Sequence, residues 1–224
     1  MNHTLPNMEA VGGKLQIKVC GMRNAQNIQD LANLKPNYIG FIFYPKSPRY
    51  APNLDAQAVS AIPATIQKVG VFVNETTEVM HEKALIYGLD VLQLHGKETP
   101  AQCLQLQEEG FTIFKAFPIA EANDLKNTNG YEGCCDFFLF DTKTPEHGGS
   151  GQKFDWRILE KYSGKTPFFL SGGIDLEDAE AINNISHPKC YGIDINSKFE
   201  TAPGLKDINK LKSFIKRVST NDKQ

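Results

Sequence analysis

Residues 68–94 read KVGVFVNETTEVMHEKALIYGLDVLQL, and they contain the repeating unit on which the fold prediction rests. Apolar runs at Lys68–Val73 and Val91–Leu94 flank a helical segment at Thr76–Tyr87. Both runs are nearly continuous in apolar residues instead of strictly alternating, which is typical of strands buried on both faces of a parallel sheet. The stretch therefore predicts a strand–helix–strand unit.

The same rhythm continues on both sides of this unit. Further strand-like runs are Leu15–Val19, Tyr38–Phe43, Thr112–Phe117, Phe137–Phe140, Phe168–Leu170 and Tyr191–Ile193. Further helical segments are Asn24–Leu34, Asn53–Ala61, Thr99–Glu109, Glu121–Lys126, Asp155–Lys161, Asp175–Asn183 and Lys206–Val218. Eight strands alternating with eight helices fit either a doubly wound open sheet or a closed eight-fold barrel.

The count of eight favours the barrel, although 224 residues is short of the usual ~250. No linker or shift in composition divides the chain. We therefore expect an α/β fold, a single (β/α)8 TIM barrel over residues 14–220, with a flexible tail at residues 1–13.

Composition excludes several classes of protein. The chain is 41% hydrophobic with a formal net charge of -2, so disorder is not expected. Because 24 Lys+Arg face 26 Asp+Glu, no nucleic-acid partner is expected either. No apolar run approaches the roughly 20 residues of a membrane helix, and the start of the chain does not resemble a secretory signal. The five cysteines form no CxxC pair, which predicts reduced thiols in a cytoplasmic protein without a cysteine metal site.

Polar residues follow the strand-like runs, at the ends where a barrel of this type carries its active site. The segments concerned are Cys20-Gly21, Tyr44 to Arg49, Gln93 to Gly96, Asp141-Thr142, Ser171-Gly172-Gly173 and Asp194 to Ser197. Barrels of this class often bind a phosphate between the loops after strands seven and eight. Gly172 and Gly173 lack a Cβ, so their backbone N–H groups can approach an anion, and Asn196 and Ser197 add donors. Ordinary turn chemistry remains the alternative explanation for the Gly-Gly pair.

The residues quoted so far belong to a longer ordered series. Its members are Lys18 to Gly21, Gly40 to Arg49, Gly70 to Asn74, Gln93 to Gly96, Phe140 to Thr142, Gly148 to Gly151, Phe154 to Trp156, Ser171 to Gly173 and Pro203-Gly204. This series resembles the phosphoribosylanthranilate isomerase family of tryptophan biosynthesis, over nearly the whole chain from about Lys14 to the last helix. The resemblance implies the eight-fold barrel, independently of the strand count.

The resemblance also implies an activity, that of an intramolecular oxidoreductase (an aldose–ketose isomerase) that uses no cofactor and no metal. Its substrate would be N-(5-phosphoribosyl)anthranilate, converted by an Amadori rearrangement. The implied roles are Cys20 as general base, Asp141 as general acid and Arg49 as the residue that holds the anthranilate carboxylate. Substrate binding is expected at Gly149, Ser150, Gly151, Gly172, Gly173, Asn196 and Ser197. The only partner expected is the small phosphorylated substrate, for a monomer or homodimer.

General chemistry allows these roles but does not require them. The apolar run before Asp141 favours its protonated form, yet an Asp after a strand also often caps a loop. Only a few per cent of a free thiol is ionised at neutral pH, so Cys20 needs a nearby cation or helix start, and a lone Cys is usually a small buried hydrophobe. His95 is expected to support the site without transferring a proton. The strand-eight loop departs from the family, which more often has two serines and a glycine where Asn196, Ser197 and Lys198 stand.

Three other functions compete with the isomerase. A Schiff-base aldolase would need a Lys at a central strand end, but strand six ends in Asp141. The related isomerase of histidine synthesis pairs two Asp residues, whereas strand one here ends in Cys20. A ligand-binding protein without activity would tolerate loss of Cys20 or Asp141, and the presence of both argues against it.

Overall fold

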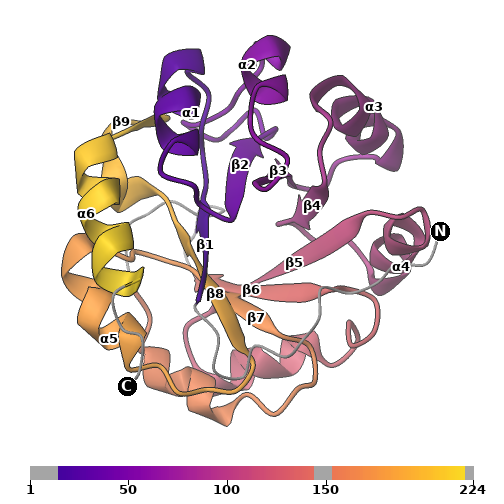
Figure 1. Cartoon of the computed structure of the whole chain (residues 1–224). Coiled ribbons are helices and arrows are strands. Elements are labelled where there is room, and N and C mark those ends of the chain that lie inside the picture. Colours follow the sequence, from indigo (N-terminus) through magenta and orange to yellow (C-terminus); the bar gives the residue numbers. More distant parts are fainter. Residues whose placement is uncertain (1–14, 144–152, 220–224) are drawn as a thin grey trace.

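The eight strands close into a parallel barrel in the order β1 to β8, which confirms the predicted TIM barrel. The computed structural model describes residues 15–143 and 153–219, and Figure 1 views the barrel along its axis with helices around it. The strands are β1 Gln16–Val19, β2 Tyr38–Ile42, β3 Gln67–Phe72, β4 Val91–Leu94, β5 Thr112–Ile119, β6 Phe137–Thr142, β7 Phe168–Leu170 and β8 Cys190–Ile195. Each predicted strand is present within two residues at either end.

Six α-helices occur in the described part of the chain. They are α1 Ala25–Ala32, α2 Ala56–Ser60, α3 Thr77–Tyr87, α4 Pro100–Glu108, α5 Ala179–Asn183 and α6 Ile208–Ser219. Asn24 caps α1, because its side chain accepts a hydrogen bond from the Asn27 N–H at 2.9 Å. No described helix has the length and apolar character of a membrane span.

The connections after β5 and β6 differ from the prediction. The segments expected as helices there are 3-10 helices, η1 Ala122–Thr128 and η2 Trp156–Lys161. In η1 the Asp124 carboxylate accepts hydrogen bonds from the N–H groups of Ala120 and Glu121, which fixes a tight turn at the start of the segment. After β7 the 3-10 turn η3 Leu176–Asp178 precedes α5.

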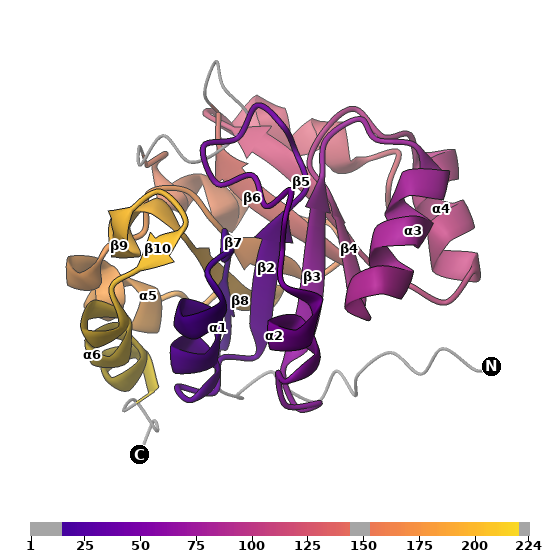
Figure 2. The ribbon, with the colours of Figure 1, turned by 90° about the horizontal axis from the view of Figure 1, so that it is seen from above.

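A short hairpin between β8 and α6 was not predicted. The turn η4 Ser197–Phe199 leads into β9 Glu200–Ala202, which pairs antiparallel with β10 Leu205–Lys206 and lies above α6 in Figure 2. Lys206 is therefore in a strand instead of the last helix. The hairpin brings Glu200 and Lys206 against the end of the barrel, where they contact the pocket residues Arg49 and Asn196.

Two layers of apolar side chains build the core. The outer layer fills the space between sheet and helices and includes Ile17 and Val19 of β1. The inner layer lies inside the barrel and is largely aromatic, with the Phe114 and Phe169 rings 4.9 Å apart between centroids. Because successive side chains of a strand alternate, Lys18 of β1 and the next residue but one, Cys20, point inward. The aromatic layer thus forms a solid floor beneath the site.

Candidate active site

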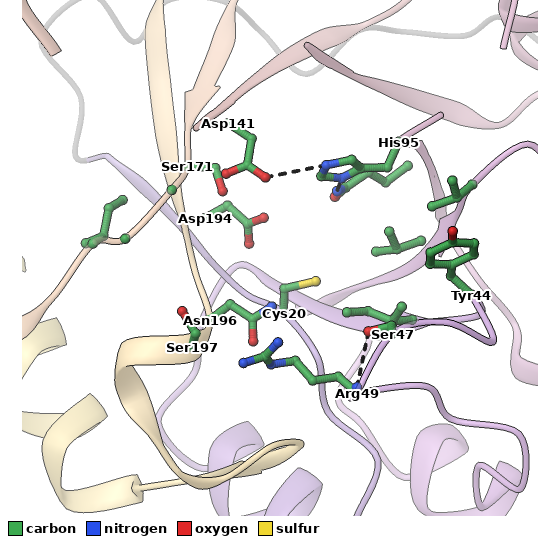
Figure 3. A pocket seen from close by; sticks show the side chains of 17 residues that line it. Cys20, Tyr44, Ser47, Arg49, His95, Asp141, Ser171, Asp194, Asn196 and Ser197 are labelled. Atoms are coloured by element: carbon green, nitrogen blue, oxygen red, sulfur yellow. Dashed lines mark hydrogen bonds and ion pairs between the residues drawn. The ribbon is translucent and has the colours of Figure 1, made fainter. Parts of the chain in front are cut away.

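One pocket at the carboxyl ends of the strands brings together every described residue that the sequence analysis assigned to catalysis or binding. These residues are Cys20, Arg49, Asp141, Gly172, Gly173, Asn196 and Ser197. Figure 3 shows the labelled side chains reaching into it from different strands. Gly149, Ser150 and Gly151, and the tail at residues 1–13, lie outside the described residues. Among the described residues, no group of three or more His, Cys, Asp or Glu side chains is arranged to hold a metal ion.

Asp141 is the penultimate residue of β6 and is buried, with 7% of its surface exposed. Its Oδ1 accepts a hydrogen bond from the Thr142 N–H at 2.9 Å, which fixes the carboxyl group in the pocket. Its Oδ2 lies 3.4 Å from Nε2 of His95, the residue that follows β4 (Figure 3). The expectation that His95 supports the site is consistent with this contact.

Gln93 is a buried polar neighbour of His95 in the pocket. Gln93 lies 3.1 Å from His95 Nδ1 through its amide nitrogen, while its Oε1 is buried and has no hydrogen-bond partner among the described residues.

Cys20 follows β1 and is almost completely buried, with 4% of its surface exposed. Burial raises the pKa of the thiol, since a thiolate is poorly solvated there, and the Asp194 carboxylate raises it further. The Lys18 and Lys206 ammonium groups oppose this and lower the pKa. Cations of the kind expected beside Cys20 are therefore present, and both are lysines.

Arg49 is buried and bound by a carboxylate of the β9–β10 hairpin. Its Nε and Nη2 donate to Glu200, with 2.7 Å between Nη2 and Oε2. Lys206 Nζ lies 2.7 Å from Glu200 Oε1 on the other side. Burial opposes ionisation of Glu200, but hydrogen bonds from Arg49 and the charge of Lys206 hold its pKa below the usual value. A guanidinium group has five N–H donors and Glu200 engages two, so Arg49 keeps donors for a second anion.

The loops after β7 and β8 meet at one side of the pocket. Gly172 and Gly173 both adopt left-handed backbone conformations, with φ of 93° and 64°. A Cβ on Gly172 would clash with Oγ1 of Thr142, so a glycine is needed for this close approach. The result is a pair of backbone N–H groups unshielded by side chains, as an anion site requires.

The structure also accounts for Asn196, which departs from the usual family sequence. Lys206 Nζ lies 2.6 Å from Asn196 Oδ1. Because an ammonium group only donates hydrogen bonds, the amide oxygen must face Lys206 and the amide N–H2 must face away from it. Asn196 lines the pocket, with its amide N–H2 group directed away from Lys206.

Four charged residues of the site were given no role from the sequence, namely Lys18, Asp194, Glu200 and Lys206, although Asp194 was among the polar residues expected at a strand end. The Lys18 Nζ and Asp194 Oδ1 atoms are 2.9 Å apart inside the barrel, and β1 and β8 pair these two residues in register. The available signal was a lysine in the middle of an apolar strand, because a charge there needs a buried partner. The sequence does not show which residue that partner is.

A closed eight-stranded barrel with a polar pocket at the carboxyl ends of its strands defines the class of this protein, a (β/α)8-barrel enzyme. The family model described as N-(5'phosphoribosyl)anthranilate (PRA) isomerase matches residues 17–217. An isomerase of this name from Parabacteroides distasonis is 55% identical over 204 residues, covering 90% of this chain and 92% of the relative. The chain therefore belongs to the N-(5'-phosphoribosyl)anthranilate isomerase family.

Solved structures agree with this assignment. A dimeric isomerase of this family from Thermotoga maritima, crystallised as monomers, superimposes with a TM-score of 0.75 at 30% identity, covering 91% of this chain and 98% of that one. A second isomerase, in complex with reduced 1-(o-carboxyphenylamino)-1-deoxyribulose 5-phosphate, gives 0.77 at 28% identity with the same coverage. The resemblance noted from the sequence is thus confirmed, and the chain is an aldose–ketose isomerase of tryptophan biosynthesis.

Proposed function

We propose that this pocket performs the Amadori rearrangement of N-(5-phosphoribosyl)anthranilate with Asp141 as general acid and Cys20 as general base. The observation that carries this proposal is the entry of both side chains into one pocket, from β6 and β1. The product is 1-(2-carboxyphenylamino)-1-deoxyribulose 5-phosphate. Conversion is measured directly by adding the substrate and following the loss of its fluorescence.

The reaction needs one proton donated and one removed. Asp141 gives its proton to the ribose ring oxygen as the C1–O bond breaks, and the nitrogen lone pair forms a protonated imine at C1. Cys20 then removes the proton from C2, and the electrons of that C–H bond flow into the imine to give an enolamine. Tautomerisation of the enolamine yields the ketone. The protonated imine is the electron sink, so the scheme requires only these two proton-transfer groups.

Asp141 is well placed to be the acid. Its backbone neighbour holds one carboxyl oxygen through the Thr142 N–H, and His95 Nε2 lies beside the other. His95 and the Thr142 N–H together fix the position of the Asp141 carboxyl group in the pocket.

Arg49 is proposed to bind the anthranilate carboxylate. Glu200 fixes the guanidinium plane through its Nε and Nη2 atoms, which leaves three donors for the substrate. This fixed orientation reduces the entropy lost on binding a second planar anion.

We expect Arg49→Ala to raise KM by roughly 10- to 100-fold with a much smaller change in kcat, because charge-assisted hydrogen bonds to the substrate are lost. Lys206 still neutralises Glu200 in this variant, so the fold is retained. The matched control is Arg157→Ala, which removes an exposed arginine paired with Asp155 and leaves KM unchanged. Steady-state kinetics decide the matter, and an unaltered KM for Arg49→Ala would place the carboxylate elsewhere.

The phosphate is proposed to lie between the Gly172–Gly173 loop and the Asn196–Ser197 loop. Both loops line the pocket, and the Asn196 amide oxygen faces Lys206, which leaves its N–H2 group as a donor for the substrate. Gly149, Ser150 and Gly151 are proposed as further substrate contacts on the strength of the sequence series alone. In this proposal the two anionic groups of the substrate bind to separate donors, the carboxylate to Arg49 and the phosphate to the two loops.

Gly172→Ala is expected to raise KM at least about tenfold and to weaken competitive inhibition by inorganic phosphate, because its Cβ forces the loop away from Thr142. Gly133→Ala is the matched control. Gly133 also has a positive φ, of 80°, but a Cβ there meets nothing within 4 Å. It therefore carries the same backbone strain, about 1 kcal/mol, without a clash and far from the pocket. Equal kinetics for the two variants would remove Gly172 from the phosphate site.

We also propose a monomer or homodimer in the cytoplasm, with the phosphorylated sugar as its only ligand and no nucleic-acid or membrane partner. The isomerase from Thermotoga maritima is described as dimeric. All five cysteines of this chain are free thiols, a state that a reducing compartment maintains. Sedimentation equilibrium distinguishes the two oligomeric states.

A further inference from the structure

A lysine lies inside the barrel, directly beneath the thiol. Lys18 is completely buried, with 0% of its side chain exposed, although the pocket does not reach it. It precedes Cys20 by two residues on β1, so the two side chains point to the same face of the strand. Its Nζ lies 2.9 Å from Asp194 Oδ1. The ammonium group is therefore held at the level just below Cys20.

Stability alone does not explain this ion pair. Burying two charges costs several kcal/mol per ion before their attraction is counted, and apolar replacements of buried pairs are often equally stable. The inner core of this barrel is otherwise apolar and aromatic, including Phe114, Phe137 and Phe169. A lysine and an aspartate between this floor and the pocket thus call for a role in the site.

We propose that Lys18 is a positioning residue for the reaction, whose ammonium group, anchored by Asp194, stabilises the thiolate of Cys20 from beneath the pocket. The proposal rests on the role of Cys20 as general base given above. Lys18 touches neither the substrate nor the solvent. It acts by making available the ionised form that removes the C2 proton.

The other charged and titratable groups around Cys20 do not replace Lys18. They are Asp194 of β8, Lys206 of β10, and Tyr44, Arg49, His95 and Asp141 around the pocket. Asp194 raises the pKa of Cys20 and so opposes the thiolate, while Lys206 acts in the same direction as Lys18 but more weakly.

Lys18 and Lys206 differ in their own charge. Burial lowers the pKa of Lys206 to about 8, although Glu200 opposes this, so its charge is partly lost near that pH. Burial also disfavours the charged form of Lys18, but Asp194 and Cys20 outweigh it and raise the pKa above the usual value. Lys18 therefore keeps its charge more readily than Lys206 does.

The test measures the thiol without substrate. Iodoacetamide reacts with thiolates, and Cys20 lines the pocket, so its alkylation rate against pH, followed by mass spectrometry of its peptide, reports its ionisation. In Lys18→Met we expect alkylation of Cys20 at pH 7.5 to be at least about tenfold slower, with the midpoint at higher pH. The rising limb of kcat/KM against pH, which reports ionisation of the general base, should move to higher pH by the same amount.

Two further variants separate an effect on the thiolate from misfolding or a general loss of stability. Lys18→Met combined with Asp194→Asn removes both charges, so no orphaned carboxylate threatens folding, and alkylation should still be slowed because the effect of Lys18 exceeds that of Asp194. Lys115→Met is the matched control, since it deletes a buried lysine of β5 that pairs with Glu98 at 3.3 Å, outside the barrel wall. It should cost stability and leave alkylation of Cys20 unchanged. Circular dichroism confirms the fold of each variant.

A comparison of two thiols in the wild-type protein provides an independent test. Cys190 is a less buried thiol whose pKa burial raises to about 12. If Lys18 stabilises the thiolate, Cys20 is alkylated at lower pH than Cys190 despite its poorer access.

The inference is overturned by unchanged alkylation in a folded Lys18 variant, or by a Cys20 midpoint at or above that of Cys190. A shift in alkylation with an unmoved pH–rate profile would instead uphold Lys18 and refute Cys20 as the base.

Discussion

Asp141→Asn is expected to lower kcat by about 10³-fold while KM and the thermal unfolding midpoint change little. The amide has the shape of the carboxyl group and its Oδ1 can still accept the Thr142 N–H, so the backbone and the pocket keep their form. It cannot transfer a proton to the ribose ring oxygen, which leaves ring opening without an acid. The measurement is kcat from the loss of substrate fluorescence, beside thermal unfolding followed by circular dichroism.

The control lies at the other end of the same strand. Asp136 precedes β6 and is also buried, and its Oδ2 accepts the Ile113 N–H at 2.7 Å. Asp136→Asn weakens this charge-assisted bond and should lower stability by about 1 kcal/mol without loss of kcat. The opposite pattern in the two variants separates chemistry from structure. Turnover of Asp141→Asn within tenfold of the wild type would remove Asp141 from the acid role.

The strands were predictable because each is a short, nearly continuous apolar run. In a closed barrel whose strands pair in chain order, the order of these runs along the sequence also gives the neighbours of each strand. The segments after β5 and β6 were less predictable. Their apolar spacing suits one turn of helix, but side-chain bonds such as those of Asp124 select the tighter 3-10 form. The β9–β10 hairpin was missed because strands of three and two residues leave no periodic pattern.

The sequence was sufficient to predict those site residues that directly follow the strands. Every described residue assigned to it lines one pocket, because all the carboxyl ends of parallel strands meet at one rim. The partners of the buried charged residues could not be predicted from the sequence. Lys18 and Asp194 are 176 positions apart, and Arg49 and Glu200 are 151 apart, so neither partner can be identified from the residues around the other. Such pairs exist only once the barrel has closed.

Cys20→Ala is expected to lower kcat by about 10²- to 10⁴-fold, since removal of the C2 proton then has no base. The fold should survive, because replacing a thiol by a hydrogen in this small buried side chain leaves only a slight cavity. Cys20→Ser should be similarly inactive, as a hydroxyl group is far less acidic than a thiol and forms no base at neutral pH. Kinetics of purified variants with circular dichroism provide the measurement.

The pH dependence makes this prediction specific to an ionising thiol. Burial and Asp194 raise the pKa of Cys20 and Lys18 lowers it, so the thiol is the dominant form at neutral pH and the thiolate fraction grows as pH rises. The wild-type kcat/KM should therefore increase with pH through this range, and the residual activity of Cys20→Ala should lack that increase. Cys103→Ala, which removes a similarly buried thiol on the inner face of α4, should keep both the rate and the pH dependence. A Cys20→Ala enzyme that retained the rising limb would show that another group takes the C2 proton, since the only ionisation deleted is that of Cys20.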